Sequence, residues 1–280
     1  MSESVLQPGH VAVVTGAGSG IGAALAMAFG AAGGRVVLAD VEVDALERVA
    51  AKLTAEGVEV LTVPTDVSDP GAVDRLASAT IERFGCVNVL CNNAGVSTFN
   101  LLADQTMADW RWVLGVNLWG VVHGVQSFVP IMRAQATPAH IVNTSSIAGL
   151  WSGISFIGPY AVSKVGVVSL SETLHAELRA EQSPIGVSVL CPSSVDTNVM
   201  EAERNRPTLL GAEHRTEVAE SVRLMIRDGL SGADGKTPAE VATITLDAIR
   251  HDRFWIITHA SARATLEARF ASILADLPEN

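Results

Sequence analysis

The chain has 280 residues with a hydrophobic content of 48%, which suits one large α/β domain with a sizeable core better than two separate domains. A formal net charge of −11 and the lack of an evident basic patch argue against a surface for nucleic acid or for an acidic membrane. The first residues have neither the basic start nor the apolar stretch of an export signal, so we expect a cytoplasmic protein.

Short β-branched runs alternate with longer helical patterns from His10 onward, which predicts a parallel sheet wrapped by helices. Strands are expected at 10–15, 35–40, 58–64, 87–92, 140–145, 186–191 and 254–258. Helices are expected from the glycine-rich turn to about residue 32 and at about 43–56, 70–84, 106–134, 158–181, 238–251 and 260–276. The last of these is predicted to be a closing amphipathic helix.

One long segment of the chain is strongly apolar and another is polar. The apolar run 112–132 contains Asn117, His123 and Gln126, which favours a buried core or interface helix over a membrane span. The polar segment 198–235 has two weak helical patterns and predicts a lid or binding loop. The cysteines lie in or beside apolar runs, so we expect buried thiols without disulfides, and no metal site is indicated by the spacing of the histidines or of Cys86, Cys91 and Cys191.

A glycine-rich turn joins the first strand to the first helix. Glycines there allow a tight turn and close approach of the backbone to a pyrophosphate at the helix N-terminus, and the candidate binding residues are Gly16, Ser19, Gly20, Ile21 and Gly22. The second strand ends in Asp40, 24 residues after Gly16, where a carboxylate accepts hydrogen bonds from adenosine ribose. No Lys or Arg occupies 17–21 or 41–43, so NAD is predicted over NADP. Asp66 is expected either at the adenine edge or as a helix cap.

Tyr160 and Lys164 stand four residues apart, just after a Gly-Pro pair that favours the start of a helix. Residues at i and i+4 share one helix face, so the Lys164 ammonium can lie near the Tyr160 phenol. A free tyrosine has a pKa of about 10, and a nearby cation favours the phenolate. Such a pair is often only a helix face, but Tyr160 is the one tyrosine of the chain. The serines at 145–146 follow the preceding strand, so a hydroxyl and a phenol can meet over one reacting oxygen.

Five motifs in order make the chain similar to the short-chain dehydrogenase/reductase family. They are TGAGSGIG at 15–22, NNAG at 92–95, NLWG around Asn117, SSIAG at 145–149 and YAVSK at 160–164. The resemblance covers residues 10 to about 258. It implies a Rossmann-type, doubly wound parallel sheet of about seven strands in one dinucleotide-binding catalytic domain spanning 1–280. It also implies a catalytic tetrad of Asn117, Ser146, Tyr160 and Lys164, with further cofactor contacts at Val67, Asn93, Ala94, Gly95, Pro192, Val195 and Thr197.

The resemblance also implies roles for the tetrad. Tyr160 would move the proton of an alcohol, and Ser146 would position the substrate oxygen. Lys164 would lower the pKa of Tyr160 and hold the nicotinamide ribose, while Asn117 would help keep a water in a proton relay.

Two departures from the family pattern stand out. Ser146 lies 14 residues before Tyr160 where the family has about 13, so an extra residue is expected in the loop 150–158, and Ser145 is the alternative hydroxyl. Ser193 stands where a glycine is usual after Pro192 and is expected to allow the turn.

The candidate substrate-facing residues are mostly large and apolar, which favours a bulky hydrophobic or aromatic secondary alcohol or ketone over a sugar. They are Ser97, Phe99, Trp151, Ile154, Phe156, Val199 and Met200, and plain core packing is the alternative for each. The segments 198–235 and 238–270 are similar to a branch that includes dehydrogenases of lignin-derived aryl alcohols. The resemblance further implies a homodimer or homotetramer. The leading hypothesis is an NAD-dependent alcohol dehydrogenase or carbonyl reductase; the alternatives are an NAD-retaining epimerase or dehydratase and a non-catalytic dinucleotide-binding sensor.

Overall fold

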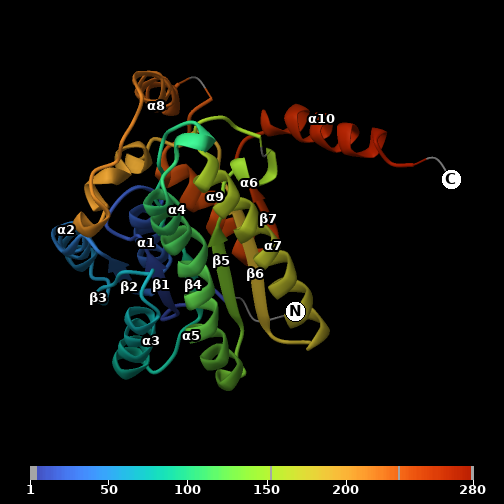
Figure 1. Cartoon of the computed structure of the whole chain (residues 1–280). Helices are drawn as coiled ribbons and strands as arrows, with labels where there is room; N and C mark the ends of the chain where they lie inside the picture. The colour runs from blue at the N-terminus through green and yellow to red at the C-terminus, as the bar shows by residue number, and fades with distance from the viewer. Residues whose placement is uncertain (1–4, 152, 233, 279–280) are drawn as a thin grey trace.

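Seven parallel strands form one sheet in the computed structural model, which describes residues 5–151, 153–232 and 234–278 (Figure 1). The order across the sheet is β3-β2-β1-β4-β5-β6-β7. The strands are β1 (Val11–Thr15), β2 (Arg35–Asp40), β3 (Val60–Pro64), β4 (Val89–Asn92), β5 (Ala139–Thr144), β6 (Ile185–Cys191) and β7 (Trp255–Ile257). Near-continuous apolar runs suit such strands because helices cover both faces of a parallel sheet. The predicted doubly wound, Rossmann-type fold is confirmed, with strand ends that differ from the prediction by one or two residues.

Two layers of helices bury the two faces of the sheet. One core packs α1 (Gly20–Ala31), α2 (Val43–Ala55) and α9 (Pro238–Arg250) against the strands. The other core packs α3 (Pro70–Phe84), α5 (Gly120–Gln135) and α7 (Gly158–Ala180) against the opposite face. The crossover helices therefore fix the carboxyl ends of the strands at one edge, where ligands bind in open α/β sheets.

The predicted helix 106–134 is interrupted. It consists of α4 (Met107–Leu114), a π-helical turn η2 (Gly115–Trp119) and α5, and the 3₁₀ turn η1 (Leu102–Asp104) precedes it. π-turns inside α-helices are rare and frequent at functional sites. By length and composition alone the stretch Met107–Gln135 could cross a membrane, but Phe128, Val129 and Met132 pack in the core under the sheet. It is a core helix, as predicted.

The predicted lid is mostly helical. Segment 198–235 contains η3 (Asn198–Asn205), η4 (Thr208–Leu210) and α8 (Glu217–Leu230). The short helix α6 (Ala148–Trp151), which follows β5, was not predicted from the sequence. The homo-oligomer stays a prediction; the helices on which it rests leave Trp119, Val162 and Val165 exposed.

The predicted C-terminal helix at about 260–276 is present as α10 (Ala262–Ala275), but it does not bury one apolar face against the domain, as an amphipathic helix would. Figure 1 shows α10 projecting away from the remainder of the chain. Among its residues only Ala262 is buried, and Phe270, Ile273 and Leu274 are exposed. Its main contact with the remainder of the described chain is with α6, where Arg269 donates a hydrogen bond to the Leu150 carbonyl.

A buried histidine makes the stability of the fold depend on pH. His140 in β5 is 2% exposed, and its Nε2 lies 2.7 Å from Ser188 Oγ in β6. Burial lowers the pKa of His140 from 6.5 to about 4, although the charge of Asp252 opposes the shift. Between those values the unfolded chain binds the proton and the folded protein does not, so stability is lost as pH falls below 6.5.

We expect His140 to account for about 2 kcal/mol of lost unfolding free energy between pH 7 and pH 5, since each pKa unit corresponds to about 1.4 kcal/mol. Urea unfolding of wild type and His140→Gln at both pH values measures this contribution. The exposed His251 supplies the matched control His251→Gln. A His140→Gln variant with the full wild-type pH dependence would contradict the assignment.

Candidate active site

A cavity of about 450 Å³ lies at the carboxyl ends of the strands, below the lid. Its wall combines the glycine-rich turn, the ends of β2, β4, β5 and β6, the start of α7 and the residues of η3. The volume falls in the range of small-molecule sites, and the place is the one at which open α/β sheets bind ligands.

The glycine-rich turn approaches the NNAG segment too closely for side chains. Gly16 has φ +67°, and a Cβ there would lie 2.9 Å from Ala94 Cα. Gly22 does not lie on the cavity wall. A Cβ there would collide with the Gly16 carbonyl oxygen, so a glycine is needed for the first turn of α1 to pack against the glycine-rich turn. Thr15 Oγ1 accepts hydrogen bonds from the N–H groups of Asn93 (2.8 Å) and Ala94 (3.1 Å). Thr15 thus links the glycine-rich turn to the NNAG segment, a role that was not predicted from the sequence.

The acid at the end of β2 is held by backbone hydrogen bonds. Asp40 Oδ2 accepts the N–H of Gly18 at 2.9 Å and Oδ1 accepts the N–H of Glu42 at 3.0 Å. Asp66 and Val67 lie on the cavity wall. Asp66 Oδ1 accepts the N–H and the hydroxyl of Ser68, whereas the cap of α3 is Asp69. The helix-cap alternative for Asp66 is therefore wrong.

The four tetrad candidates converge in the structure. The π-turn η2 directs Asn117 inward, where its Oδ1 accepts the Val96 N–H at 2.8 Å and its Nδ2 donates to Ser163 Oγ at 3.1 Å. Lys164 is 3% exposed, and its Nζ donates to the Thr144 carbonyl at 2.8 Å. A Cβ built on Gly95 would lie 3.5 Å from Lys164 Nζ and 3.6 Å from Asn117 Oδ1, so the two side chains face one small space.

The two candidate serines have different surroundings. Ser145 Oγ donates to the carbonyl of Lys164 at 2.7 Å, which ties β5 to α7. Ser146 Oγ has only a long contact of 3.4 Å to the Pro192 carbonyl as donor, accepts the Ala148 N–H at 3.1 Å, and is a hydrogen-bond partner of the Tyr160 phenol. The geometry therefore favours Ser146 as the hydroxyl that faces a substrate.

The expected lowering of the Tyr160 pKa by Lys164 is absent in the structure. Burial raises the pKa of Tyr160, and the hydrogen bond with Ser146 opposes that shift. Lys164 Nζ lies 5.5 Å from the ring centroid, next to the Thr144 carbonyl. Burial also lowers the pKa of Lys164 to about 8. The pair is arranged for proton transfer, but the protein by itself does not produce a ready phenolate.

The loop after β6 also borders the cavity. Pro192, Val195 and Thr197 all lie on the wall, as does Ser193. Ser193 is not among the non-glycine residues with positive φ, so the turn does not require the usual glycine. The Pro192 carbonyl accepts the Ile147 N–H at 2.8 Å, which fixes this loop beside the serine strand.

Five of the seven predicted substrate residues lie on the cavity wall: Ser97, Phe99, Ile154, Val199 and Met200. Trp151 and Phe156 do not, and their assignment is corrected. Trp151 belongs to α6, which packs against α10, and Phe156 sits in the loop after it with φ 70° while its carbonyl accepts the Asn100 N–H. The wall also contains apolar residues that the sequence did not single out, among them Trp112, Ile226 and Leu230.

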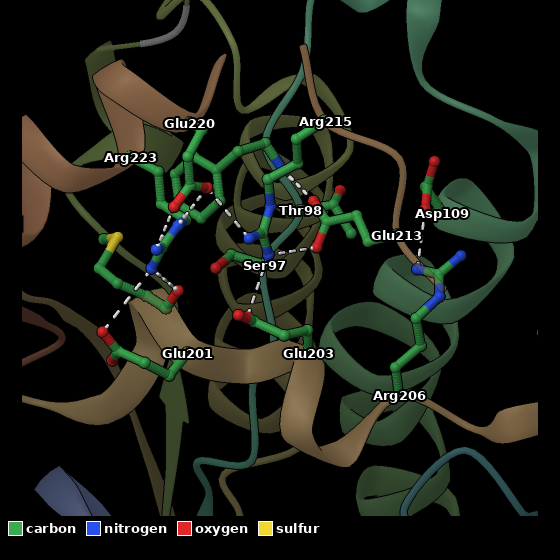
Figure 2. Close-up of polar contacts among 12 residues, drawn as sticks. Ser97, Thr98, Asp109, Glu201, Glu203, Arg206, Glu213, Arg215, Glu220 and Arg223 are labelled. Carbon is green, nitrogen blue, oxygen red and sulfur yellow. Dashed lines mark hydrogen bonds and ion pairs between the residues drawn. The ribbon is translucent and has the colours of Figure 1, made fainter. Parts of the chain in front are cut away.

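Charged side chains fasten the lid to the body of the domain (Figure 2). Arg206 Nη1 lies 2.8 Å from Asp109 Oδ1 of α4, and both side chains are almost fully buried. Arg215 pairs with Glu203 at 3.0 Å and with Glu213 at 2.6 Å. Glu213 Oε1 in turn accepts the Phe99 N–H at 2.8 Å. The lid is thus part of the cavity wall. The Asp109–Arg206 ion pair and the hydrogen bond from the Phe99 N–H to Glu213 join it to the body of the domain, whereas the Arg215 pairs lie within the lid. Within the described ranges no three His, Cys, Asp or Glu side chains form a group that could hold a metal ion.

Comparison with known proteins agrees with this geometry. The family model described as short chain dehydrogenase matches residues 10–208. A short-chain dehydrogenase/reductase from Burkholderia phymatum, solved in complex with NAD, is 44% identical, with a TM-score of 0.92 over 98% of this chain and 97% of that one. The C alpha-dehydrogenase of Sphingobium sp. strain SYK-6 is 34% identical over 95% of this chain and 85% of its own length.

A third relative, the 1-deoxy-11-beta-hydroxypentalenate dehydrogenase of Streptomyces exfoliatus, is 35% identical over 94% of this chain and 88% of its own length. Family match, sheet order and site geometry lead to one conclusion. The chain is an oxidoreductase that belongs to the short-chain dehydrogenase/reductase family.

Proposed function

We propose that the protein is an NAD-dependent dehydrogenase that interconverts a bulky hydrophobic or aromatic secondary alcohol and its ketone. The proposal rests on one observation: a single cavity is lined by the glycine-rich turn, by Asp40 at the end of β2, and by Ser146, Tyr160 and Lys164. One end of the same cavity is apolar. The apolar end is built from Phe99, Trp112 and Met200, with Ile226 and Leu230 from α8. Such walls favour a large apolar substrate through burial of its surface.

The residues at the cavity suit a dinucleotide. The pyrophosphate would lie on the turn 16–22 at the N-terminus of α1, where no side chain obstructs Gly16, and the adenosine ribose would lie at Asp40. The nicotinamide end would lie between Thr197 and Lys164. When bound, the nicotinamide supplies the hydride chemistry of the reaction.

The protein's own part is the handling of a proton. Ser146 would hydrogen-bond the substrate oxygen and hold it beside Tyr160, which as phenolate would accept the alcohol proton and as phenol would donate a proton to the ketone oxygen in the reverse direction. Lys164 would pass protons onward from the space that it shares with Asn117. Because burial raises the pKa of Tyr160, formation of the phenolate would need stabilisation by a nearby positive charge.

The test is formation of NADH by the purified protein with a panel of hydrophobic and aryl secondary alcohols, with sugars as the comparison set. Turnover of the apolar alcohols and not of the sugars is the expected result. Binding of NAD without turnover of any alcohol or ketone would favour the dinucleotide sensor instead. Cofactor that stays bound through purification, with isomerised or dehydrated product, would favour the epimerase or dehydratase.

Removing the charge of Asp40 should weaken NAD binding. Asp40→Asn keeps one oxygen that can accept a hydrogen bond but loses the charge-assisted bonds to ribose hydroxyls, so we expect the Kd for NAD to rise about tenfold. Isothermal titration calorimetry measures the Kd, and Asp44→Asn, an acid in the first turn of α2, is the control. Equal NAD affinity in Asp40→Asn and Asp44→Asn would contradict the placement of ribose at Asp40.

A further inference from the structure

The turn after β2 is joined to the lid by a carboxylate. Glu42 Oε1 accepts hydrogen bonds from Arg204 Nε at 3.1 Å and from Asn205 Nδ2 at 2.7 Å, and Arg204 Nη2 lies 2.9 Å from the same oxygen. Arg204 and Asn205 close η3, the first segment of the lid. All three residues lie on the cavity wall beside Asp40. The lid therefore meets the end of the cavity where the adenosine ribose is placed.

The Glu42 side chain does not cap α2, the helix that it precedes. It occupies the N-cap position of α2, yet its side chain makes no capping hydrogen bond to that helix. Burial raises the pKa of Glu42, but the hydrogen bond from Asn205 and the charge of Arg204 outweigh it, so the net shift of the pKa is downward. The ionised Glu42 carboxylate thus binds the two lid residues Arg204 and Asn205.

Arg204 is unusual for its position in the cavity. Among the described residues of the wall only Arg204 and Lys164 are cationic, and Lys164 lies at the opposite end, in α7. NADP differs from NAD by a 2′-phosphate on the adenosine ribose, and a nearby arginine is the usual means of accommodating that phosphate. The fork of a guanidinium suits a phosphate as well as a carboxylate. An arginine from the lid at this end of the cavity would therefore be expected to bind the 2′-phosphate of NADP if it had no partner within the protein.

Arg204 has such a partner, because Glu42 pairs with it. The Nε and Nη2 edge of Arg204 faces the Glu42 carboxylate, and Nη1 donates to the carbonyls of Asn198 and Glu201, both at 2.9 Å. Nε and Nη1 thus donate to acceptors within the protein, and Nη2 is in ion-pair contact with Glu42. We propose that Glu42 is a specificity-determining residue that favours NAD over NADP by holding Arg204 and cancelling its charge. This inference rests on the proposed function.

The test is a double-mutant cycle on cofactor affinity, measured by isothermal titration calorimetry with NAD and with NADP. Glu42→Gln keeps the length of the side chain and removes its charge. We expect its Kd for NADP to fall about tenfold relative to wild type, because a charge-assisted bond to phosphate becomes available to Arg204. The Kd for NAD should change by less than about threefold, since that cofactor lacks the phosphate. Glu47→Gln, an exposed acid on α2, controls for the change in net charge.

The double variant decides whether Glu42 acts through Arg204. If it does, the gain in NADP affinity disappears in Glu42→Gln/Arg204→Gln, which then matches Arg204→Gln alone. A gain that persists in the double variant would show simple repulsion by Glu42 and would overturn the inference. No gain in Glu42→Gln, or an equal gain in Glu47→Gln, would also overturn it while leaving the NAD-dependent function intact. A protein that binds neither cofactor would overturn the inference and the proposed function together.

Discussion

Replacement of Tyr160 by Phe is expected to reduce kcat by about 10²- to 10⁴-fold, the usual contribution of a positioned general acid or base. Tyr160 is the only tyrosine of the chain, and its phenol faces the Ser146 hydroxyl in the cavity. Phe keeps the ring that packs beside Phe99 and Ile157 and removes only the proton carrier. Steady-state NADH formation, with the alcohol that the panel selects, measures the loss.

Two controls keep this prediction specific. The Kd of Tyr160→Phe for NAD should stay within about threefold of wild type, because the phenol contributes at most one hydrogen bond to the cofactor. Ser145→Ala removes the hydroxyl that ties the Lys164 carbonyl, and it should lower stability more than it lowers kcat. An unchanged kcat in Tyr160→Phe would refute the mechanism.

The single tyrosine also allows the pKa argument to be checked directly. Phenolate absorption in the near ultraviolet reports Tyr160 alone, because no other tyrosine contributes. In the cofactor-free protein we assign a raised pKa to this residue, since burial disfavours the charged phenolate. The sequence supported the opposite direction because an i, i+4 pair indicates only that two residues share a helix face. It does not indicate that Lys164 would turn toward the Thr144 carbonyl.

Much of the cofactor side could be predicted because its motifs stand at the ends of neighbouring parallel strands. The glycine-rich turn follows β1, Asp40 ends β2, and NNAG begins at the end of β4, so sheet topology alone brings them to one edge. Each motif also has a local physical reason, such as the collision that a side chain at Gly22 would cause. Spacing and residue type were sufficient at these places.

Contacts between remote segments could not be predicted in the same way. Glu42 and Arg204 are separated by 162 positions, so the residues adjacent to Asp40 in the sequence do not reveal this cation. Trp151 and Phe156 were assigned by their size and by their place before Tyr160, but a short helix and a left-handed residue direct that loop elsewhere. Where the path of the backbone depends on irregular loops, residue type does not determine which side chains meet.

The buried pair Asp109–Arg206 is the second site at which we expect a large effect. Asp109 Oδ2 accepts the N–H and the hydroxyl of Thr106 in a capping box at the start of α4, at 2.7 Å and 2.6 Å. Its Oδ1 faces Arg206 Nη1 at 2.8 Å without the alignment of a hydrogen bond, so charge attraction dominates that contact. Arg206 also lies over the Trp112 ring, 5.4 Å from its centroid. The pair therefore joins the lid to a helix that contributes to the substrate wall.

Asp109→Asn should lower the free energy of unfolding by about 3 kcal/mol, because it leaves the Arg206 charge buried without its counter-ion. Urea unfolding at neutral pH measures the loss. The exposed pair Arg75–Asp69 supplies the control, and Arg75→Met should cost less than about 1 kcal/mol. In Asp109→Asn/Arg206→Met no uncompensated charge remains, so most of the lost stability should return. If Asp109→Asn costs no more than Arg75→Met, the ion pair does not hold the lid.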